Sequence, residues 1–209
     1  MYIRNLRKPA PNKNVFKFAS AKVGEAIMCE SSLEFDACFH HEYNENVKCF
    51  RSQPEGFYYS FEGKKLPYTP DAIIYNNDGS VILHEYKPYS KTVDPLFMAK
   101  FSAKKETAKR LGIKLLLVTE NQIRVYPLLN NLKILHRYIG IYELNETQKT
   151  LLNLIKNSGR MSVSDIAKIR TLTMGQTRAQ IYSLINKGIV KADLINDDLV
   201  SNPYVWSIA

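Results

Sequence analysis

Long apolar stretches, cysteines and acidic side chains are all scarce in this chain of 209 residues. The longest aliphatic run is Leu115–Val118, far below the roughly 20 residues that a membrane-spanning helix needs. No apolar stretch follows the positive charges at the start of the sequence, so we expect no secretory signal. The three cysteines, Cys29, Cys38 and Cys49, show no CxxC spacing, which favours free thiols in a reducing compartment over disulfides or a zinc site. We therefore expect a soluble intracellular protein.

The remaining composition is that of an ordinary globular protein. Hydrophobic residues make up 45% of the chain and charged residues 23%, with only nine glycines and nine prolines. These proportions exclude a collagen-like or a disordered chain. The length suits one or two domains with a substantial hydrophobic core.

The shortage of acids leaves a formal net charge of +9 and a pI of about 9.3, which favours a polyanionic partner. Residues 1–140 carry 21 Lys and Arg against 14 Asp and Glu, a net charge of +7, whereas residues 141–209 carry 8 against 6. Six basic residues precede the first acid, Glu25: they are Arg4, Arg7, Lys8, Lys13, Lys17 and Lys22. Because this opening has two prolines and little apolar periodicity, we predict a flexible basic N-terminal arm over residues 1–22.

A second group of basic residues follows in the middle of the chain. If residues 95–111 form a helix, the apolar side chains share one face and the lysines form a different stripe: these are Lys100, Lys104, Lys105 and Lys109. Such a stripe is either a solvated helix face or, near a catalytic site, a surface that contacts DNA phosphates.

Residues 23–140 show the pattern of an α/β domain. The expected elements are a helix over 22–45, strands over 57–61, 71–75, 81–87 and 113–119, the basic helix, and a possible edge strand over 122–126. Turn residues stand at 62–65 and at 76–79. The order predicts a small mixed sheet flanked by helices.

Residues 141–209 predict a separate small domain. Amphipathic patterns indicate helices from Leu144 to Ile155, over 163–170 and over 174–186, followed by a hairpin of 189–194 and 204–208. Three helices followed by a hairpin are typical of a winged helix. The residues of the third helix that would face a major groove are Gln176, Thr177, Arg178, Gln180 and Tyr182. The low net charge of +2 leaves docking onto a protein as an open alternative.

The stretch that carries chemistry is Pro70-Asp71, followed after thirteen residues by Glu85-Tyr86-Lys87. In a strand, Glu85 and Lys87 point the same way and Tyr86 the opposite way. Two close carboxylates attract a divalent cation, and oxygen ligands suit Mg²⁺ or Mn²⁺. A nearby ammonium orients an attacking water and stabilises charge that develops on a phosphate. This set is sufficient for phosphodiester hydrolysis, although the same spacing also arises as a surface ion pair on a strand.

The combination of motifs resembles the TnsA-type transposon-end endonucleases of the PD-(D/E)xK nuclease superfamily. The resemblance spans about residues 25–126 and is carried by Glu30-Ser31-Ser32-Leu33-Glu34, Ser52-Gln53-Pro54, Tyr68-Thr69-Pro70-Asp71, His84-Glu85-Tyr86-Lys87-Pro88 and Leu117-Val118-Thr119-Glu120. It implies a restriction-endonuclease-like fold over residues 23–140, followed by the family's winged-helix domain over residues 141–209.

The resemblance also implies roles for individual residues. Glu34 resembles the helix-borne acid of the active site, with Glu30 as its substitute. Asp71 resembles the aspartate that binds the metal, and Glu85 stands at the position where some members carry Gln. Lys87 resembles the catalytic lysine. The expected catalytic residues are thus Glu34, Asp71, Glu85 and Lys87, with the three acids as ligands of Mg²⁺ (or Mn²⁺). The expected DNA contacts are Arg4, Arg7, Lys8, Lys100, Lys104, Lys105, Lys109 and Arg178.

By the same resemblance, the protein is the endonuclease subunit of a heteromeric transposase that cuts the 5′ ends of a transposon in double-stranded DNA. A TnsB-type integrase and a TnsC-type AAA+ regulator are the implied partners, in a bacterial cytoplasm with no membrane association. Two alternatives stay open: a stand-alone restriction-type or junction-resolving nuclease, and a non-catalytic DNA-binding or adaptor protein.

Overall fold

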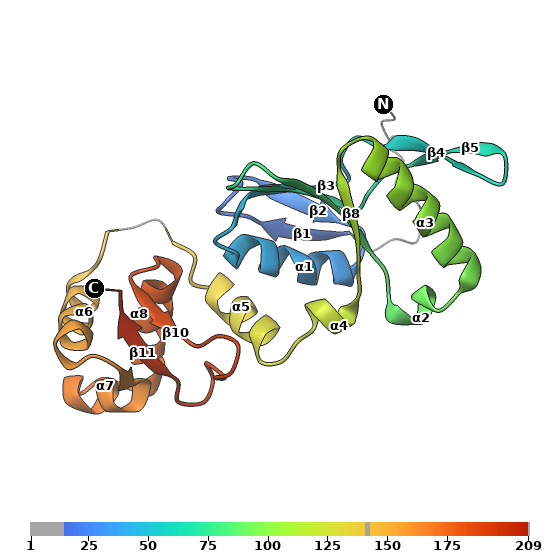
Figure 1. Cartoon of the computed structure of the whole chain (residues 1–209). Helices are drawn as coiled ribbons and strands as arrows, with labels where there is room; N and C mark the ends of the chain where they lie inside the picture. Colours follow the sequence, from blue (N-terminus) through green and yellow to red (C-terminus); the bar gives the residue numbers. More distant parts are fainter. Residues whose placement is uncertain (1–14, 141–142, 209) are drawn as a thin grey trace. The chain divides into compact units, whose positions relative to one another are not determined.

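The computed structural model describes residues 15–140 and 143–208 and divides the chain into two compact units, one up to Val125 and one from Tyr126. The sequence led us to expect the division between residues 140 and 141. Each unit is described below by itself, with the element labels of Figure 1.

The first unit is built on a four-stranded mixed sheet, as expected. Its strands are β3 (Val47–Ser52), β6 (Ala72–Asn76), β7 (Val81–Tyr86) and β8 (Lys114–Val118), in the order β3-β6-β7-β8. Neighbours pair antiparallel except β7 and β8, which are parallel. A parallel pair needs a crossover connection, and α3 (Pro95–Arg110), which follows the short α2 (Tyr89–Thr92), provides it.

The predicted basic helix and the hairpin before it cover part of this sheet. Strands β4 (Phe57–Phe61) and β5 (Lys64–Tyr68) pair around the predicted turn at Glu62-Gly63, where both residues have positive φ. Figure 1 shows α3 beside this hairpin. The core that joins hairpin, helix and sheet consists of Tyr59, Tyr68, Leu83, Phe101, Ala108 and Leu115.

The N-terminal part of the first unit differs from the expectation. The helix expected over 22–45 is confined to α1 (Ser32–Tyr43), and the residues before it form a hairpin of β1 (Phe16–Ala19) and β2 (Ala26–Cys29). Phe18 is buried at 1% exposure with its ring against Phe39, so residues 16–19 of the expected flexible arm are part of the fold. Residues 1–14 lie outside the described part of the chain.

The possible edge strand over 122–126 is also corrected. Residues Glu120–Ile123 form a short helix, α4, because Thr119 and Gln122 make a reciprocal capping box at its start. Such a box satisfies backbone donors at a helix N-terminus.

The second unit contains four helices and a three-stranded antiparallel sheet among its described residues. The elements are α5 (Leu128–His136), α6 (Glu146–Ser158), β9 (Met161–Ser162), α7 (Val163–Arg170), α8 (Met174–Asn186), β10 (Val190–Ala192) and β11 (Tyr204–Ser207). The strand order is β10-β11-β9. The helices α7 and α8 have the predicted bounds, and the predicted hairpin is present as β10 and β11.

Helix α5, which the sequence did not lead us to expect, explains the shifted boundary. Its Asn131 is fully buried and donates to the carbonyls of Leu194 and Asp197, while its Oδ1 accepts from the amide of Leu199. These bonds tie α5 to the β10–β11 loop.

The shifted boundary changes the net charge of the second unit. With the boundary between residues 125 and 126, the unit carries 10 Lys and Arg against 6 Asp and Glu, a net charge of +4 instead of the +2 assigned to residues 141–209.

Within the ranges 15–140 and 143–208, no helix combines the length and apolar character that crossing a membrane requires.

Candidate active site

Antiparallel pairing of β6 and β7 brings the predicted chemical residues together. Asp71 directly precedes β6, and its amide donates to the carbonyl of His84 at 3.0 Å. Along β7 the side chains alternate, so Glu85 and Lys87 lie on the side of Asp71. Tyr86 points the other way, toward α1, where its hydroxyl lies 2.7 Å from Nε2 of His41.

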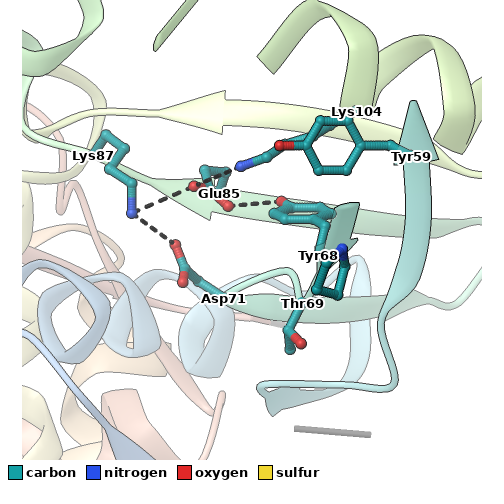
Figure 2. Close-up of a pocket in the computed structure, with 8 residues that line it drawn as sticks. Tyr59, Tyr68, Thr69, Asp71, Glu85, Lys87 and Lys104 are labelled. Carbon is teal, nitrogen blue, oxygen red and sulfur yellow. Dashed lines mark hydrogen bonds and ion pairs between the residues drawn. The ribbon is translucent and has the colours of Figure 1, made fainter. Parts of the chain in front are cut away.

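The three side chains form a compact charged cluster (Figure 2). The Nζ atom of Lys87 lies 3.3 Å from Oε1 of Glu85 and 4.0 Å from Oδ2 of Asp71. The hydroxyl of Tyr68 donates to Oε2 of Glu85 at 2.7 Å. Glu85 is only 4% exposed, so its charge depends on these partners rather than on water.

Lys104 joins the cluster from α3, and Tyr59 and Tyr68 line it from the hairpin. Lys104 places Nζ 3.6 Å from Oε1 of Glu85. Together with Tyr59 and Tyr68, it lines the pocket that Asp71, Glu85 and Lys87 also line (Figure 2).

Burial and repulsion between the acids set the electrostatics. Burial, and then the charge of Glu85, raise the pKa of Asp71 to about 7, although Lys87 and the amide of Tyr86 act in the opposite direction. Burial lowers the pKa of Lys87, but the carboxylates of Asp71 and Glu85 outweigh it, and the pKa lies above its usual value. Burial lowers the pKa of Lys104, and Glu85 offsets this effect in part.

The helix-borne acid Glu34 lies in the adjoining pocket, which Asp71 and Lys87 also line. Its carboxylate accepts hydrogen bonds from the hydroxyl of Ser31 at 2.8 Å and from the amide of Glu30 at 2.9 Å. The predicted third acid is therefore next to the cluster but is engaged at the start of α1. In the described ranges, no three His, Cys, Asp or Glu side chains are arranged as a metal-holding group.

The pair of Asp71 and Glu85 nevertheless fits a hard divalent cation. Both are oxygen donors, which Mg²⁺ and Mn²⁺ prefer, and their mutual repulsion contributes to the raised pKa of Asp71. A cation between them would relieve that repulsion.

The basic residues expected to contact DNA differ in how exposed they are. Lys105 and Lys109 are exposed on α3, whereas Lys100 is partly buried, with Nζ 5.8 Å from the centroid of the Phe61 ring. Lys104 belongs to the charged cluster. Arg4, Arg7 and Lys8 lie outside the described residues.

In the second unit, three of the five α8 residues expected to face a groove need correction, while Gln176 is exposed and Gln180 is half-buried. Thr177 and Tyr182 are buried, and their hydroxyls bond to the carbonyls of Thr173 and Leu199. Arg178 donates to the carbonyls of Val200 and Ser201, so its guanidinium is held by the β10–β11 loop. Arg178 and Tyr182 therefore bond to the β10–β11 loop, and Thr177 bonds to the backbone at the start of α8.

Two partners of Glu85, Lys104 and Tyr68, are not predicted from the sequence. The sequence places Lys104 on a stripe of lysines and Tyr68 in the Tyr-Thr-Pro-Asp motif, and neither position predicts a contact with Glu85. The usable signal for Tyr68 is the predicted turn at 62–65, because the strand that returns from it ends at Tyr68, three residues before Asp71.

Comparison with known families bears directly on this cluster. Residues 44–120 match the family described as TnsA-like endonuclease N terminal. The match contains Asp71, Glu85, Lys87 and Lys104, and it leaves out Glu34 and the whole second unit. No curated protein matches the chain. The family match and the mixed sheet together support a nuclease related to transposase subunits.

Proposed function

We propose that this chain is a divalent-metal-dependent DNA endonuclease that cuts the 5′ ends of a transposon as one subunit of a heteromeric transposase. The observation that carries the proposal is the contact of Lys87 with both Asp71 and Glu85, inside the segment that matches an endonuclease family. A surface ion pair on a strand, the simpler interpretation of this motif, does not account for a Glu85 side chain that is 4% exposed.

In this proposal, Asp71 and Glu85 hold Mg²⁺ or Mn²⁺, and Glu34 adds negative charge from the adjoining pocket. A divalent cation in such a site neutralises a phosphate and lowers the pKa of a bound water. The residues of the chain set the geometry. The amide of Tyr86 fixes Oδ2 of Asp71, and the hydroxyl of Tyr68 fixes Oε2 of Glu85.

In this proposal, Lys87 supplies a positive charge from the protein itself, beside the divalent cation. In the metal-free protein its ammonium contacts both carboxylates. Beside a bound cation it would orient the attacking water by hydrogen bonding and stabilise the charge that develops on the phosphate. Against the lowering effect of burial, the carboxylates of Asp71 and Glu85 raise its pKa above the usual value in the metal-free protein, and a DNA phosphate would take the place of these counter-charges when the cation is bound. We therefore assign it electrostatic stabilisation rather than the removal of a proton.

We further propose that the second unit is a winged helix that does not read DNA sequence. Its three helices α6, α7 and α8 and its three-stranded sheet follow the winged-helix order. Thr177 and Tyr182 are buried, and Arg178 donates to backbone carbonyls of the β10–β11 loop. The other two residues expected to face a groove, Gln176 and Gln180, accept hydrogen bonds from Thr173 and Asn145. The choice of DNA ends then falls to the partners, a TnsB-type integrase and a TnsC-type AAA+ regulator.

A cleavage assay on DNA that contains transposon ends, with and without the integrase, tests this function. We expect metal-dependent cuts at the 5′ ends that require the integrase. Equal cutting without the integrase would favour a stand-alone nuclease, and integrase-dependent binding without any cut would favour an adaptor.

A further inference from the structure

Lys104 belongs to α3, yet it reaches the carboxylate of Glu85 on β7. Its Nζ is 3.6 Å from Oε1, the same oxygen that Lys87 contacts at 3.3 Å. Figure 2 shows the two lysines converging on this one carboxylate. The side chain of Lys104 is 15% exposed, whereas Lys105 and Lys109 on the same helix are exposed.

The β4–β5 hairpin directs Lys104 into the site. Nζ lies 4.1 Å from the centroid of the Tyr68 ring and 6.0 Å from that of Tyr59. Aromatic faces attract an ammonium group. Because the hydroxyl of Tyr68 also donates to Glu85, a single side chain positions both the acid and the second lysine.

Among the side chains that line this pocket, the charges balance only without a metal. Asp71 and Glu85 carry two negative charges when ionised, and Lys87 and Lys104 carry two positive ones. Once a divalent cation sits on the two carboxylates, both ammonium groups lose their counter-charge. The anion that restores the balance in a nuclease is a DNA phosphate.

We propose that Lys104 is a second functional lysine of this site: it holds Oε1 of Glu85 in the metal-free protein and contacts a non-bridging phosphate oxygen of DNA when the divalent cation is bound. The inference rests on the proposed function, since it takes Asp71 and Glu85 as the cation-binding pair. It separates Lys104 from the exposed lysines of α3, whose contacts with DNA would not depend on the cation.

The first test measures the binding of Mn²⁺ alone to the full chain by calorimetry, without DNA. In Lys104→Met the competing ammonium is gone, so we expect Mn²⁺ to bind about three- to tenfold more tightly than to wild type. Lys104→Arg keeps the charge and should keep the wild-type affinity. Lys105→Met, which removes an exposed charge one position along α3, is the matched control and should leave the affinity unchanged. An unchanged or weaker affinity in Lys104→Met would overturn the inference.

The second test measures DNA binding as a function of salt, in a Lys87→Gln background that we expect not to cleave. Each phosphate contact contributes about 0.9 to the slope of log K against log salt. Adding Lys104→Met should reduce the slope by about 0.9 when Mn²⁺ is present and should not change it when Mn²⁺ is absent. An equal effect in both conditions, or none in either, would contradict a cation-dependent phosphate contact. Lys105→Met should act alike in both conditions.

Neither readout requires cleavage, so the two proposals fail separately. Wild type that cuts DNA, with an Mn²⁺ affinity that Lys104→Met leaves unchanged, would overturn only the role of Lys104. Wild type that binds Mn²⁺ and shows the predicted Lys104 effects but cuts no DNA would overturn only the proposed function. Wild type that binds no Mn²⁺ would contradict both. Thermal melting checks the fold of each variant, and Lys104→Gln replaces Lys104→Met if the latter does not fold.

Discussion

The carboxylate of Asp71 accepts a hydrogen bond from the backbone amide of Tyr86, with 2.8 Å between N and Oδ2. This bond crosses from the end of β7 to the residue that precedes β6. It fixes Asp71 beside the two residues that flank Tyr86, namely Glu85 and Lys87. The arrangement of the site is therefore a property of the paired strands and does not depend on a loop.

Asp71 should destabilise the metal-free protein. Its pKa is about 7 in the fold and near its ordinary value of about 3.9 in the unfolded chain. The folded state therefore binds more protons between these values, and its stability falls as the pH rises from about 4 to about 7. Above that window, Asp71→Asn should raise the free energy of unfolding by an amount on the order of 2–4 kcal/mol. Denaturant unfolding at pH 8 in the presence of a chelator measures it.

The matched control for this stability effect is Asp78→Asn. Asp78 lies in an exposed turn, and hydrogen bonds from Ser80 lower its pKa. Its replacement should not stabilise the protein. Equal unfolding free energies for wild type and Asp71→Asn would show that the ionised carboxylate of Asp71 does not destabilise the folded state.

The cleavage rate should depend on pH and on cation concentration together. A proton and a divalent cation compete for the carboxylate of Asp71, so the rate should rise with pH through a midpoint near 7 at low Mn²⁺. At higher Mn²⁺ the midpoint should move to lower pH. Single-turnover rates over a range of pH at two Mn²⁺ concentrations measure the midpoint. A midpoint that does not change with the Mn²⁺ concentration would argue against Asp71 as a ligand.

The exposed lysines of α3 should contribute to DNA affinity whatever the base sequence of the DNA. Neutralising Lys105 and Lys109 together should lower the slope of log K against log salt by about 1.8. The control is Lys114→Gln, an exposed lysine at the start of β8, whereas the charged cluster lies at the end of β7. Fluorescence anisotropy over a range of salt concentrations measures the slope for the variant of Lys105 and Lys109 and for the control. An unchanged slope in the Lys105 and Lys109 variant would mean that the contact surface is not on α3, and an equal effect per lysine in the control would mean that it is not confined to α3.

The buried Asn131 should be essential to the second unit. Asn131→Ala leaves the carbonyls of Leu194 and Asp197 and the amide of Leu199 without this partner. Buried polar groups that lose their partner cost about 1–3 kcal/mol each. We expect hydrogen exchange of the full-length protein to accelerate in α8 and β10 and to stay unchanged in β6 and β7. Unchanged exchange in α8 would show that the bonds of Asn131 do not stabilise the second unit.

Local signals explain what the sequence predicted well. The turn at Glu62-Gly63 follows β4, and in the structure α7 and α8 begin directly after residues whose side chains cap them, Ser162 and Thr173. The neighbourhood of Asp71, Glu85 and Lys87 followed from strand alternation and one antiparallel pairing. These features depend on residues that are close in sequence or on a single register.

Long-range contacts explain what the sequence did not predict. The bonds of Asn131 reach residues 63 to 68 positions later, so α5 could not be assigned to the second unit from its own pattern. The ring of Phe18 packs against Phe39 and Phe50 from two other elements. Because these contacts are distant in sequence, the local pattern of residues 16–19 indicated a basic arm instead of a strand. The place of Lys104 at Glu85 likewise depends on how α3 packs on the β4–β5 hairpin.

The most direct test of the central claim is metal-dependent strand cleavage by the chain with its partner integrase, compared between Asp71→Asn and Asp78→Asn. We predict that Asp71→Asn lowers the cleavage rate at least about a hundredfold, while it folds and binds DNA as wild type does. Asp78→Asn should cut at the wild-type rate. Undiminished cleavage by a folded Asp71→Asn would contradict the assignment of this cluster as the catalytic site.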